Sequence, residues 1–202
     1  TTTGPLGQGL GNSVGMAIAE EILRKKFGST LINNKTYVIA SDGDLMEGVS
    51  HEVMSLAGHL KLNNLIVFFD NNKISIDGST SLSVSDNYKK RFEGYGWNYL
   101  EINGHNEKQI SKAISKASKS NKPTIISCKT VIGFGSPNKS GKASSHGAPL
   151  GEQEITLVRK KLHWKYEPFQ IPDDIFNAWR AIGEKGIKLE AKWLQTLNKK
   201  NL

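Results

Sequence analysis

The sequence predicts an α/β fold in which an open, mostly parallel sheet has helices on both of its faces. Short apolar runs that suit buried strands alternate with segments whose apolar residues recur every three or four positions, the spacing of a helix face. Strands that alternate with helices form parallel sheets covered on both sides. The 202 residues, 37% of them hydrophobic, are enough for one domain with a sizeable core.

The first half of the chain supplies the opening elements of this series. A glycine-rich turn and helical spacing over residues 8–27 predict a tight turn that opens a helix. TYVIAS at residues 36–41 predicts a short buried strand, and apolar residues between 49 and 60 predict the helix that follows. NLIVFFD at residues 64–70 predicts the next strand.

The second half continues the alternation. We expect a short helix ending in glycine at residues 86–96, a strand at 97–103, a helix with its buried face over 110–117, and a closing strand at 123–132. Cys128, the single cysteine, lies in the closing strand and reads as a small core residue.

A long loop follows the last strand. Residues 133–151 are rich in glycine and serine and have no apolar periodicity, and long loops in compact domains are often functional. Beyond it we expect a short helix and a weakly amphipathic helical tail, although Gly183 and Gly186 lower the helix propensity of the tail. We therefore divide the chain into an α/β domain at residues 1–166 and an extended and helical segment at residues 167–202.

The charge distribution limits the choice of partners. The 27 Lys and Arg exceed the 19 Asp and Glu, but the lysines are scattered, so we expect phosphate-bearing small molecules rather than nucleic acid. No apolar run is long enough to cross a bilayer, and no membrane partner is expected. A lone cysteine and the lack of a secretion signal favour the cytoplasm. Because the chain begins without Met at a turn that should follow a strand, we expect it to belong to a longer protein.

Acidic residues follow the strand at residues 36–41. In an open parallel sheet, ligands bind beyond the carboxyl ends of the strands. Asp42 lies at such an end, and Asn71 and Asn72 follow the next strand. A carboxylate and an amide oxygen suit Mg²⁺ or Ca²⁺ when diphosphate oxygens and a backbone carbonyl complete the shell, and Gly43 would let the backbone approach a phosphate.

The same residues also allow a purely structural interpretation. Asp42 would then be the N-cap of the following helix, and Asn71 and Asn72 would form a turn, as these residue types often do. Spacing alone leaves both interpretations open.

One of the five histidines differs from the rest. His146 lies in the glycine-rich loop, where a histidine can donate to a phosphate or relay protons as the loop closes over a ligand. A plain loop histidine is the alternative. For the other four we expect surface or packing roles: His51, His59, His105 and His163.

Several motifs, in the right order and over essentially the whole chain, resemble transketolase, particularly its bacterial form. SDGDLMEG followed by FFDNNKI is similar to the thiamine diphosphate signature, a Gly-Asp-Gly with an Asn further along. The other matching stretches are TTGPLGQGLGN, SLAGHLKLNNLI, KISIDG, GYGW, CKTVIGFGSPNKSG and SHGAPLG.

The resemblance implies that this chain is the diphosphate-binding, N-terminal domain of such an enzyme. Asp42, Asn72 and the backbone carbonyl of Ile74 would hold the metal ion, with Asn72 also among the cofactor-binding residues. The backbone N–H of Gly43 would contact the diphosphate. The signature departs from the family at its first glycine, which is Ser41 here, and we expect binding to survive because that position precedes the ligand.

Further roles follow from the same resemblance. Gly4 and Leu6 would line the pyrimidine and thiazolium rings, Ile76 would pack nearby, and His146 would face the diphosphate and the reacting carbon of the substrate.

Glu47 and Glu52 would belong to an acidic network across a two-fold dimer interface near the cofactors. The alternative for Glu47 is a favourable charge in the first turn of a helix, and for Glu52 a solvated face.

The implied activity is transfer of a two-carbon ketol unit from a ketose phosphate to an aldose phosphate, in the pentose phosphate pathway, with thiamine diphosphate and Mg²⁺ or Ca²⁺ as cofactors. We expect a homodimer with active sites at the interface, and a pyrimidine-binding domain that follows this chain and supplies the activating glutamate. The 202-residue chain alone should therefore be inactive. The alternatives are another thiamine diphosphate enzyme, such as deoxyxylulose-phosphate synthase or a homodimeric pyruvate dehydrogenase component, and a non-catalytic cofactor-binding or dimerisation fragment.

Overall fold

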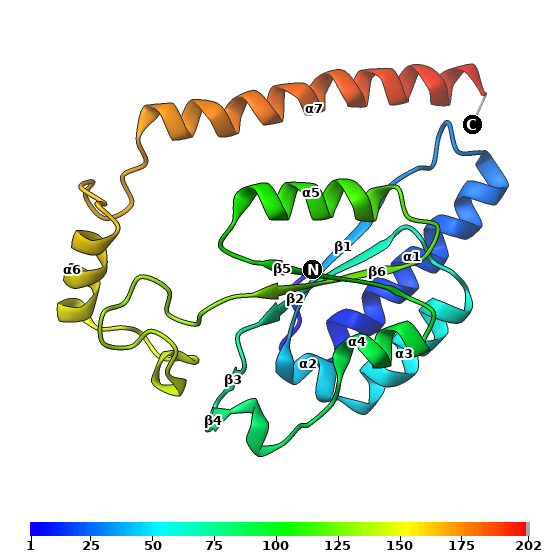
Figure 1. The fold of residues 1–202 in the computed structure, drawn as a ribbon. Coiled ribbons are helices and arrows are strands. Elements are labelled where there is room, and N and C mark those ends of the chain that lie inside the picture. The colour runs from blue at the N-terminus through cyan, green and yellow to red at the C-terminus, as the bar shows by residue number, and fades with distance from the viewer. Residues whose placement is uncertain (201–202) are drawn as a thin grey trace.

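The computed structural model describes residues 1–200 and is built around a four-stranded sheet (Figure 1). The strand order is β1-β2-β6-β5, and every neighbouring pair is parallel. The α/β fold with a mostly parallel sheet is confirmed. The bounds of these strands are β1 Thr36–Ser41, β2 Leu65–Asn71, β5 Asn98–Asn103 and β6 Thr124–Lys129.

Helices cover the two faces of the sheet unequally. The larger hydrophobic cluster joins one face of the sheet to four helices, and the smaller cluster lies between the other face and α5 alone. Figure 1 shows α5 on one side of the sheet and the other four helices on the opposite side. The helix bounds are α1 Gln8–Phe27, α2 Asp42–Met46, α3 Gly48–His59, α4 Tyr88–Gly94 and α5 Glu107–Ser118.

One face of the edge strand β1 is bare, which corrects the prediction of a short buried strand at residues 36–41. Val38 and Ala40 pack in the larger cluster, whereas Tyr37 is 53% exposed and Ile39 is 83% exposed. Successive residues of a strand point to opposite faces, and α5 packs over β5 and β6 rather than over β1.

Short elements complete the region next to the sheet. β3 (Ile74–Ser75) and β4 (Gly78–Ser79) form a small antiparallel ribbon just after β2, and the 3₁₀ turn η1 (Thr80–Leu82) follows it. The 3₁₀ turn η2 (Ala143–Ser145) is the only regular element within the glycine-rich stretch, so the predicted long loop is confirmed.

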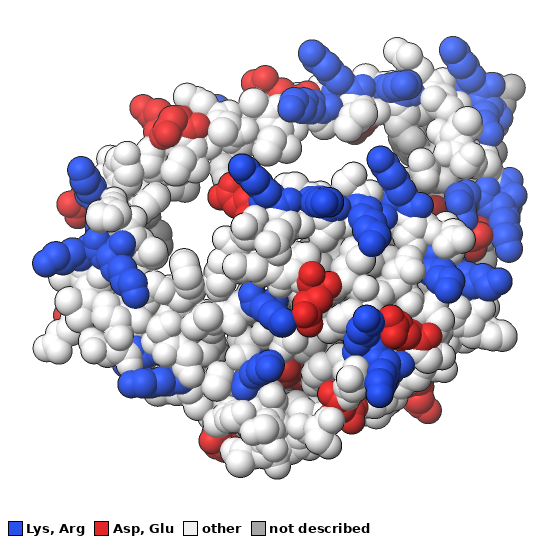
Figure 2. Space-filling view, viewed as in Figure 1, with Lys and Arg blue, Asp and Glu red and all other residues white. Residues whose placement is uncertain are grey.

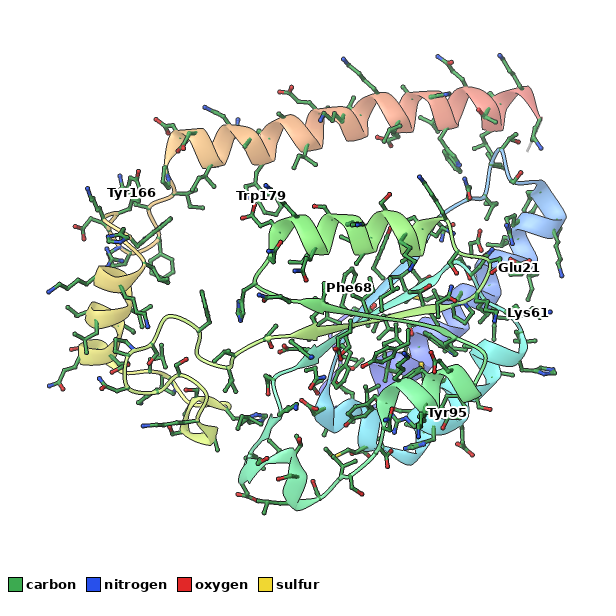
Figure 3. All side chains as sticks on the ribbon, viewed as in Figure 1. Glu21, Lys61, Phe68, Tyr95, Tyr166 and Trp179 are labelled. Atoms are coloured by element: carbon green, nitrogen blue, oxygen red, sulfur yellow. The ribbon has the colours of Figure 1, made fainter. Side chains whose placement is uncertain are left out.

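The C-terminal part of the chain is helical. α6 (Glu152–Lys161) follows the loop, and α7 (Asp173–Lys199) runs through Gly183 and Gly186 without a break. No residue of α7, which the structure describes over its whole length, is buried, and Figure 3 shows its side chains, Trp179 among them, along the helix. Its far end contacts the body of the molecule, because Nε1 of Trp193 donates to the carbonyl of Leu31 at 2.9 Å.

Burial of the cysteine, the charge distribution and the hydropathy of the helices can be compared with the sequence predictions. Cys128 is half-buried against the smaller cluster, less deeply than a core residue would be. Figure 2 shows the Lys and Arg side chains spread over the visible face, with acidic groups between them. Among the described residues, none of the helices is both long and apolar enough to span a membrane.

Candidate functional site

The carboxyl ends of β1 and β2 lie side by side. Ser41 at the end of β1 is the register partner of Asp70 near the end of β2, so Asp42 and the segment after Asn71 meet at one edge of the sheet. The predicted convergence of these two strand ends is confirmed.

Asp42 is a buried carboxylate with one oxygen atom left unpaired within residues 1–200. Asp42 is only 3% exposed. Its Oδ2 has no hydrogen-bond partner among residues 1–200. Burial raises its pKa to about 6, an effect that the backbone amide of Lys73 reduces and the nearby Asp70 carboxylate increases. A buried acceptor of this kind calls for a cation, since burying an unpaired carboxylate is costly. The residue therefore fits a divalent metal ion.

Ser41, not Asp42, is the N-cap of α2. The hydroxyl of Ser41 accepts from the backbone N–H of Asp44, and the Asp44 carboxylate accepts from the backbone N–H of Ser41 at 2.8 Å, which is a capping box. The interpretation of Asp42 as the cap is therefore wrong. Ser41 has an extended backbone with φ −100°, a conformation that needs no glycine, so the departure from the family signature leaves the local geometry intact.

The glycine-rich turn at the N-terminal end docks onto this helix. Oδ1 of Asp44 accepts from the backbone N–H of Gly7 at 3.0 Å. A Cβ atom added at Gly43 would lie 3.1 Å from Cδ1 of Leu6, so the two residues are in contact. Leu6 is 50% exposed, which leaves an apolar side chain open to a ligand beside Gly43. Gly4 is also exposed, and no described atom lies within 4 Å of the position that a Cβ atom would take. Its role beside the rings of the cofactor stays a prediction.

The turn after β2 holds Asn72 in place. Oδ1 of Asn72 accepts from the backbone N–H of Ile74 at 2.9 Å, and its Nδ2 donates to Asp70 at 3.3 Å. The turn expected here is present, and a carbonyl oxygen that accepts one hydrogen bond keeps a second lone pair for a cation. No group of three or more His, Cys, Asp and Glu side chains suited to a metal occurs in the described chain. The predicted ligand set, one carboxylate, one amide oxygen and one backbone carbonyl, is of a different kind.

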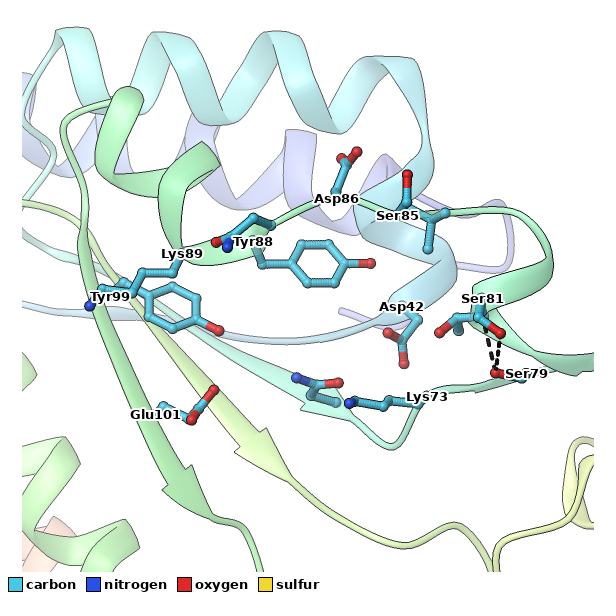
Figure 4. Close-up of a pocket in the computed structure, with 14 residues that line it drawn as sticks. Asp42, Lys73, Ser79, Ser81, Ser85, Asp86, Tyr88, Lys89, Tyr99 and Glu101 are labelled. Atoms are coloured by element: carbon cyan, nitrogen blue, oxygen red, sulfur yellow. Dashed lines mark hydrogen bonds between the residues drawn. The ribbon is translucent and has the colours of Figure 1, made fainter.

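A cavity of about 560 Å³ opens beside Asp42 (Figure 4). Tyr88 and Tyr99 line it with their rings, and Lys73 and Lys89 add positive charge. Burial raises the pKa of Tyr88 to about 12. The wall of the cavity carries both signs of charge, because Asp86 and Glu101 also line it, and the two lysines can pair with an anionic ligand such as a phosphate.

Tyr88 was missed by the sequence reasoning. It follows Asn87, whose side chain caps α4 by accepting from the N–H of Lys90 at 3.0 Å. The Asn87 cap marks the start of the short helix predicted at residues 86–96, and this is as far as the sequence locates Tyr88.

Four other predicted site residues lie on the surface. Ile76 is 70% exposed between β3 and β4, and His146 is exposed just after η2. Glu47 is exposed at the N-cap position of α3, where its side chain makes no capping hydrogen bond, and Glu52 is exposed on α3. None of the four lines the cavity beside Asp42 in the part of the chain that the structure describes.

The loop that carries His146 is tied to α6 by Glu154, a residue for which the sequence gave no signal. Glu154 is 7% exposed and accepts from the hydroxyl of Ser136 and from Asn138, whose backbone N–H lies at 2.8 Å and whose side-chain amide lies at 2.9 Å. The hydroxyl of Ser145, next to His146, donates to the carbonyl of Lys139 at 2.6 Å. The hydrogen bonds from Ser136 and Asn138 lower the pKa of Glu154 to about 2.

The fold and the site together define a class: an α/β domain whose candidate ligand site lies at the carboxyl edge of a parallel sheet. Comparison with known proteins narrows this class. The family described as transketolase, thiamine diphosphate binding domain, matches residues 1–201, and the chain belongs to that family.

Relatives of this chain are transketolases. It is 58% identical over 198 residues to the transketolase of Buchnera aphidicola subsp. Acyrthosiphon pisum and 54% identical over 198 residues to transketolase 2 of Escherichia coli, with 96% of this chain and 30% of each relative covered. The chain thus spans about 30% of the length of these relatives.

Solved structures agree with this result. The transketolase of Campylobacter jejuni superposes with a TM-score of 0.95 at 43% identity, over 98% of this chain and 31% of that one. The transketolase of Pichia stipitis in complex with sedoheptulose 7-phosphate superposes with a TM-score of 0.93 at 38% identity, over 98% of this chain and 30% of that one. The resemblance stated from the sequence motifs is confirmed.

Proposed function

We propose that this chain is the diphosphate- and metal-binding part of a transketolase, an enzyme that transfers a two-carbon ketol unit from a ketose phosphate to an aldose phosphate. The observation that carries the proposal is the buried Asp42, whose Oδ2 lacks a partner in residues 1–200, beside a cavity with two lysines. The similarity to a Pichia stipitis transketolase in complex with sedoheptulose 7-phosphate supports sugar phosphates as substrates. The same proposal places the protein in the cytoplasm and in the pentose phosphate pathway.

In this proposal, Asp42, Asn72 and the carbonyl of Ile74 hold Mg²⁺ or Ca²⁺. All three are hard oxygen donors, which these cations prefer. The backbone N–H of Gly43, near the N-terminus of α2, donates to the diphosphate of the cofactor. When bound, thiamine diphosphate supplies the nucleophilic carbon and the electron sink for cleavage of a C–C bond.

Exposed residues around this centre complete the proposed pocket. Leu6 and Ile76 present apolar side chains that suit the rings of the cofactor, and Gly4 leaves open space beside them. His146 lies on the loop that Glu154 anchors. In this proposal its imidazole faces the diphosphate and the reacting carbon of the substrate and relays protons.

The proposed assembly is a homodimer with active sites at the interface. Glu47 and Glu52 are both exposed, as interface residues must be before assembly. We propose that residues 1–166 form the diphosphate-binding domain and that residues 167–202 lead to a pyrimidine-binding domain. The activating glutamate would come from that domain, so the 202-residue chain alone should be inactive. Sedimentation of full-length Glu47→Gln tests the interface: a dimer as stable as that of the wild type would return Glu47 to a surface role.

Calorimetry on the full-length protein tests the cation site. Asp42→Ala should weaken Mg²⁺-dependent binding of thiamine diphosphate by more than ~100-fold, because even an outer-shell partner of a metal is worth ~10–100-fold. Asp173→Ala, which removes an exposed carboxylate at the start of α7, is the control and should bind as the wild type does. Equal affinities for Asp42→Ala and the wild type would contradict the metal assignment.

Activity separates the enzyme from a non-catalytic binding protein. The full-length protein, given the cofactor, Mg²⁺, a ketose phosphate and an aldose phosphate, should form product at the ~10 s⁻¹ of an ordinary enzyme. Tight cofactor binding without product would favour the non-catalytic alternative.

A further inference from the structure

Tyr88 places a phenol in the cavity beside Asp42. It is the first residue of α4, and Figure 4 shows its ring in the cavity with the hydroxyl end directed to the side where Asp42 lies. The hydroxyl is buried and has no hydrogen-bond partner within residues 1–200. A buried hydroxyl without a partner costs about 1–3 kcal/mol, so its position needs an explanation.

The unpaired atom of Asp42 is complementary to this hydroxyl. Five buried side-chain atoms lack a partner in the described chain, and two of them, the hydroxyl of Tyr88 and Oδ2 of Asp42, belong to residues that line this cavity. The phenol is a donor and the carboxylate oxygen is an acceptor. Each atom therefore offers what the other lacks.

The surrounding residues hold the Tyr88 ring in a fixed position. The ring packs edge-on against Phe69 with 4.9 Å between ring centroids, and the guanidinium of Arg91 lies 5.0 Å from the Tyr88 centroid. Arg91 is itself fixed, because it donates to the carbonyl of Leu45 at 3.0 Å and to Asp86 at 2.9 Å. The hydroxyl is thus presented to the cavity by a packed side chain, and little conformational entropy remains to be lost when it finds a partner.

We propose that Tyr88 is a positioning residue of the cation site. When a divalent cation binds one oxygen of the Asp42 carboxylate, the hydroxyl of Tyr88 donates a hydrogen bond to the other oxygen, Oδ2, and fixes the orientation of the carboxylate. Carboxylates that bind metals are commonly held by such an outer hydrogen bond. This inference rests on the proposed function, because it requires that Asp42 binds a cation.

Tyr99 provides a matched control. Its ring lines the same cavity, but its hydroxyl is not among the buried side-chain atoms that lack a hydrogen-bond partner within residues 1–200. Tyr88→Phe and Tyr99→Phe each remove one oxygen atom from the wall of one cavity. Only the first removes a buried atom that lacks a hydrogen-bond partner among the residues described.

Calorimetry and thermal unfolding of the full-length protein test the proposal. In titrations with Mg²⁺ at saturating thiamine diphosphate, Tyr88→Phe should bind Mg²⁺ about 10-fold more weakly than the wild type, the lower end of the effect of an outer-shell partner. Tyr99→Phe should bind Mg²⁺ as the wild type does. With EDTA and without cofactor, Tyr88→Phe should melt at the same temperature as the wild type or higher, because the lost hydroxyl had no hydrogen bond to lose.

The possible results separate the role of Tyr88 from the function of the site. Wild-type affinity for Mg²⁺ in Tyr88→Phe overturns the inference and leaves the proposed function standing. A lower melting temperature of Tyr88→Phe in EDTA would show a structural role for the phenol and also overturn it. If the wild type itself fails to bind Mg²⁺ and thiamine diphosphate, both the proposed function and this inference are wrong.

Discussion

Replacing Asp42 by Asn should make the metal-free chain more stable at neutral pH. The Asp42 carboxylate is 3% exposed, and burial raises its pKa from 3.8 to about 6. An acid whose pKa is raised on folding holds its proton more tightly in the folded state, so ionising it lowers the free energy of unfolding. Asparagine has nearly the same shape and no charge, so it removes this cost.

The expected size follows from the shift. A change of about two pKa units corresponds to about 3 kcal/mol at 1.36 kcal/mol per unit, an order-of-magnitude figure. The difference between Asp42→Asn and the wild type should be close to zero below pH 3.8, where the carboxyl is protonated in both states, and should reach its full value above pH 6. The wild type therefore loses this stability as the pH rises through that interval.

Urea unfolding of the 202-residue chain in EDTA, over a pH series that spans this interval, measures the difference. Asp44→Asn is the control. The Asp44 carboxylate accepts from the backbone N–H groups of Ser41 and Gly7, so the Asp44→Asn variant should be less stable than the wild type by about 1–3 kcal/mol. If Asp42→Asn is no more stable than the wild type above pH 6, the carboxylate has a partner that we have not recognised, and the case for an empty acceptor awaiting a cation is refuted.

Three further outcomes are expected. Gly58→Ala should lower the free energy of unfolding by about 1–3 kcal/mol, because its Cβ would lie 1.8 Å from a backbone oxygen of the turn after α4. Gly15→Ala, with nothing described within 4 Å, should instead stabilise α1 by ~0.5–1 kcal/mol, and urea unfolding measures both changes. Glu154→Gln should speed hydrogen exchange in the loop at residues 133–145, whereas Glu152→Gln, at an exposed residue, is the control and should not. Because the pKa of Glu154 is lowered to about 2, the protection of the wild-type loop against exchange should persist above pH 4.5 and fade as the pH falls toward 2. His146→Ala in the full-length protein should reduce turnover more than cofactor affinity, and a collapse of affinity with unchanged turnover would exclude a proton relay.

The elements of the fold could be located from the sequence because their signals are local. The helix at residues 8–27 and the strand at residues 36–41 have the predicted bounds, since periodicity and a glycine-rich turn depend only on neighbours along the chain. Asp42 stands out as a candidate ligand for the same reason: it directly follows a strand, and the carboxyl ends of parallel strands meet at one edge of the sheet.

The wrong or missing predictions have both local and distant causes. The cap of α2 is Ser41 rather than Asp42 because Asp44, three positions on, closes a capping box with Ser41. The contact of Asp44 with Gly7, 37 positions away, carries no local signal. Glu154 was overlooked because its partner Ser136 lies 18 positions before it, in a loop whose course no pattern predicts.

The sequence by itself determined the alternation of strands and helices, the position of the acidic site at the end of a strand, and, through its motifs, the family. The tertiary structure alone decided that one face of β1 stays bare, that Tyr88 and Asp42 share a cavity, and that their polar atoms have no partners within residues 1–200. Burial and pairing depend on which side chains meet after the chain has folded, and residues far apart in sequence carry no local signal of that meeting.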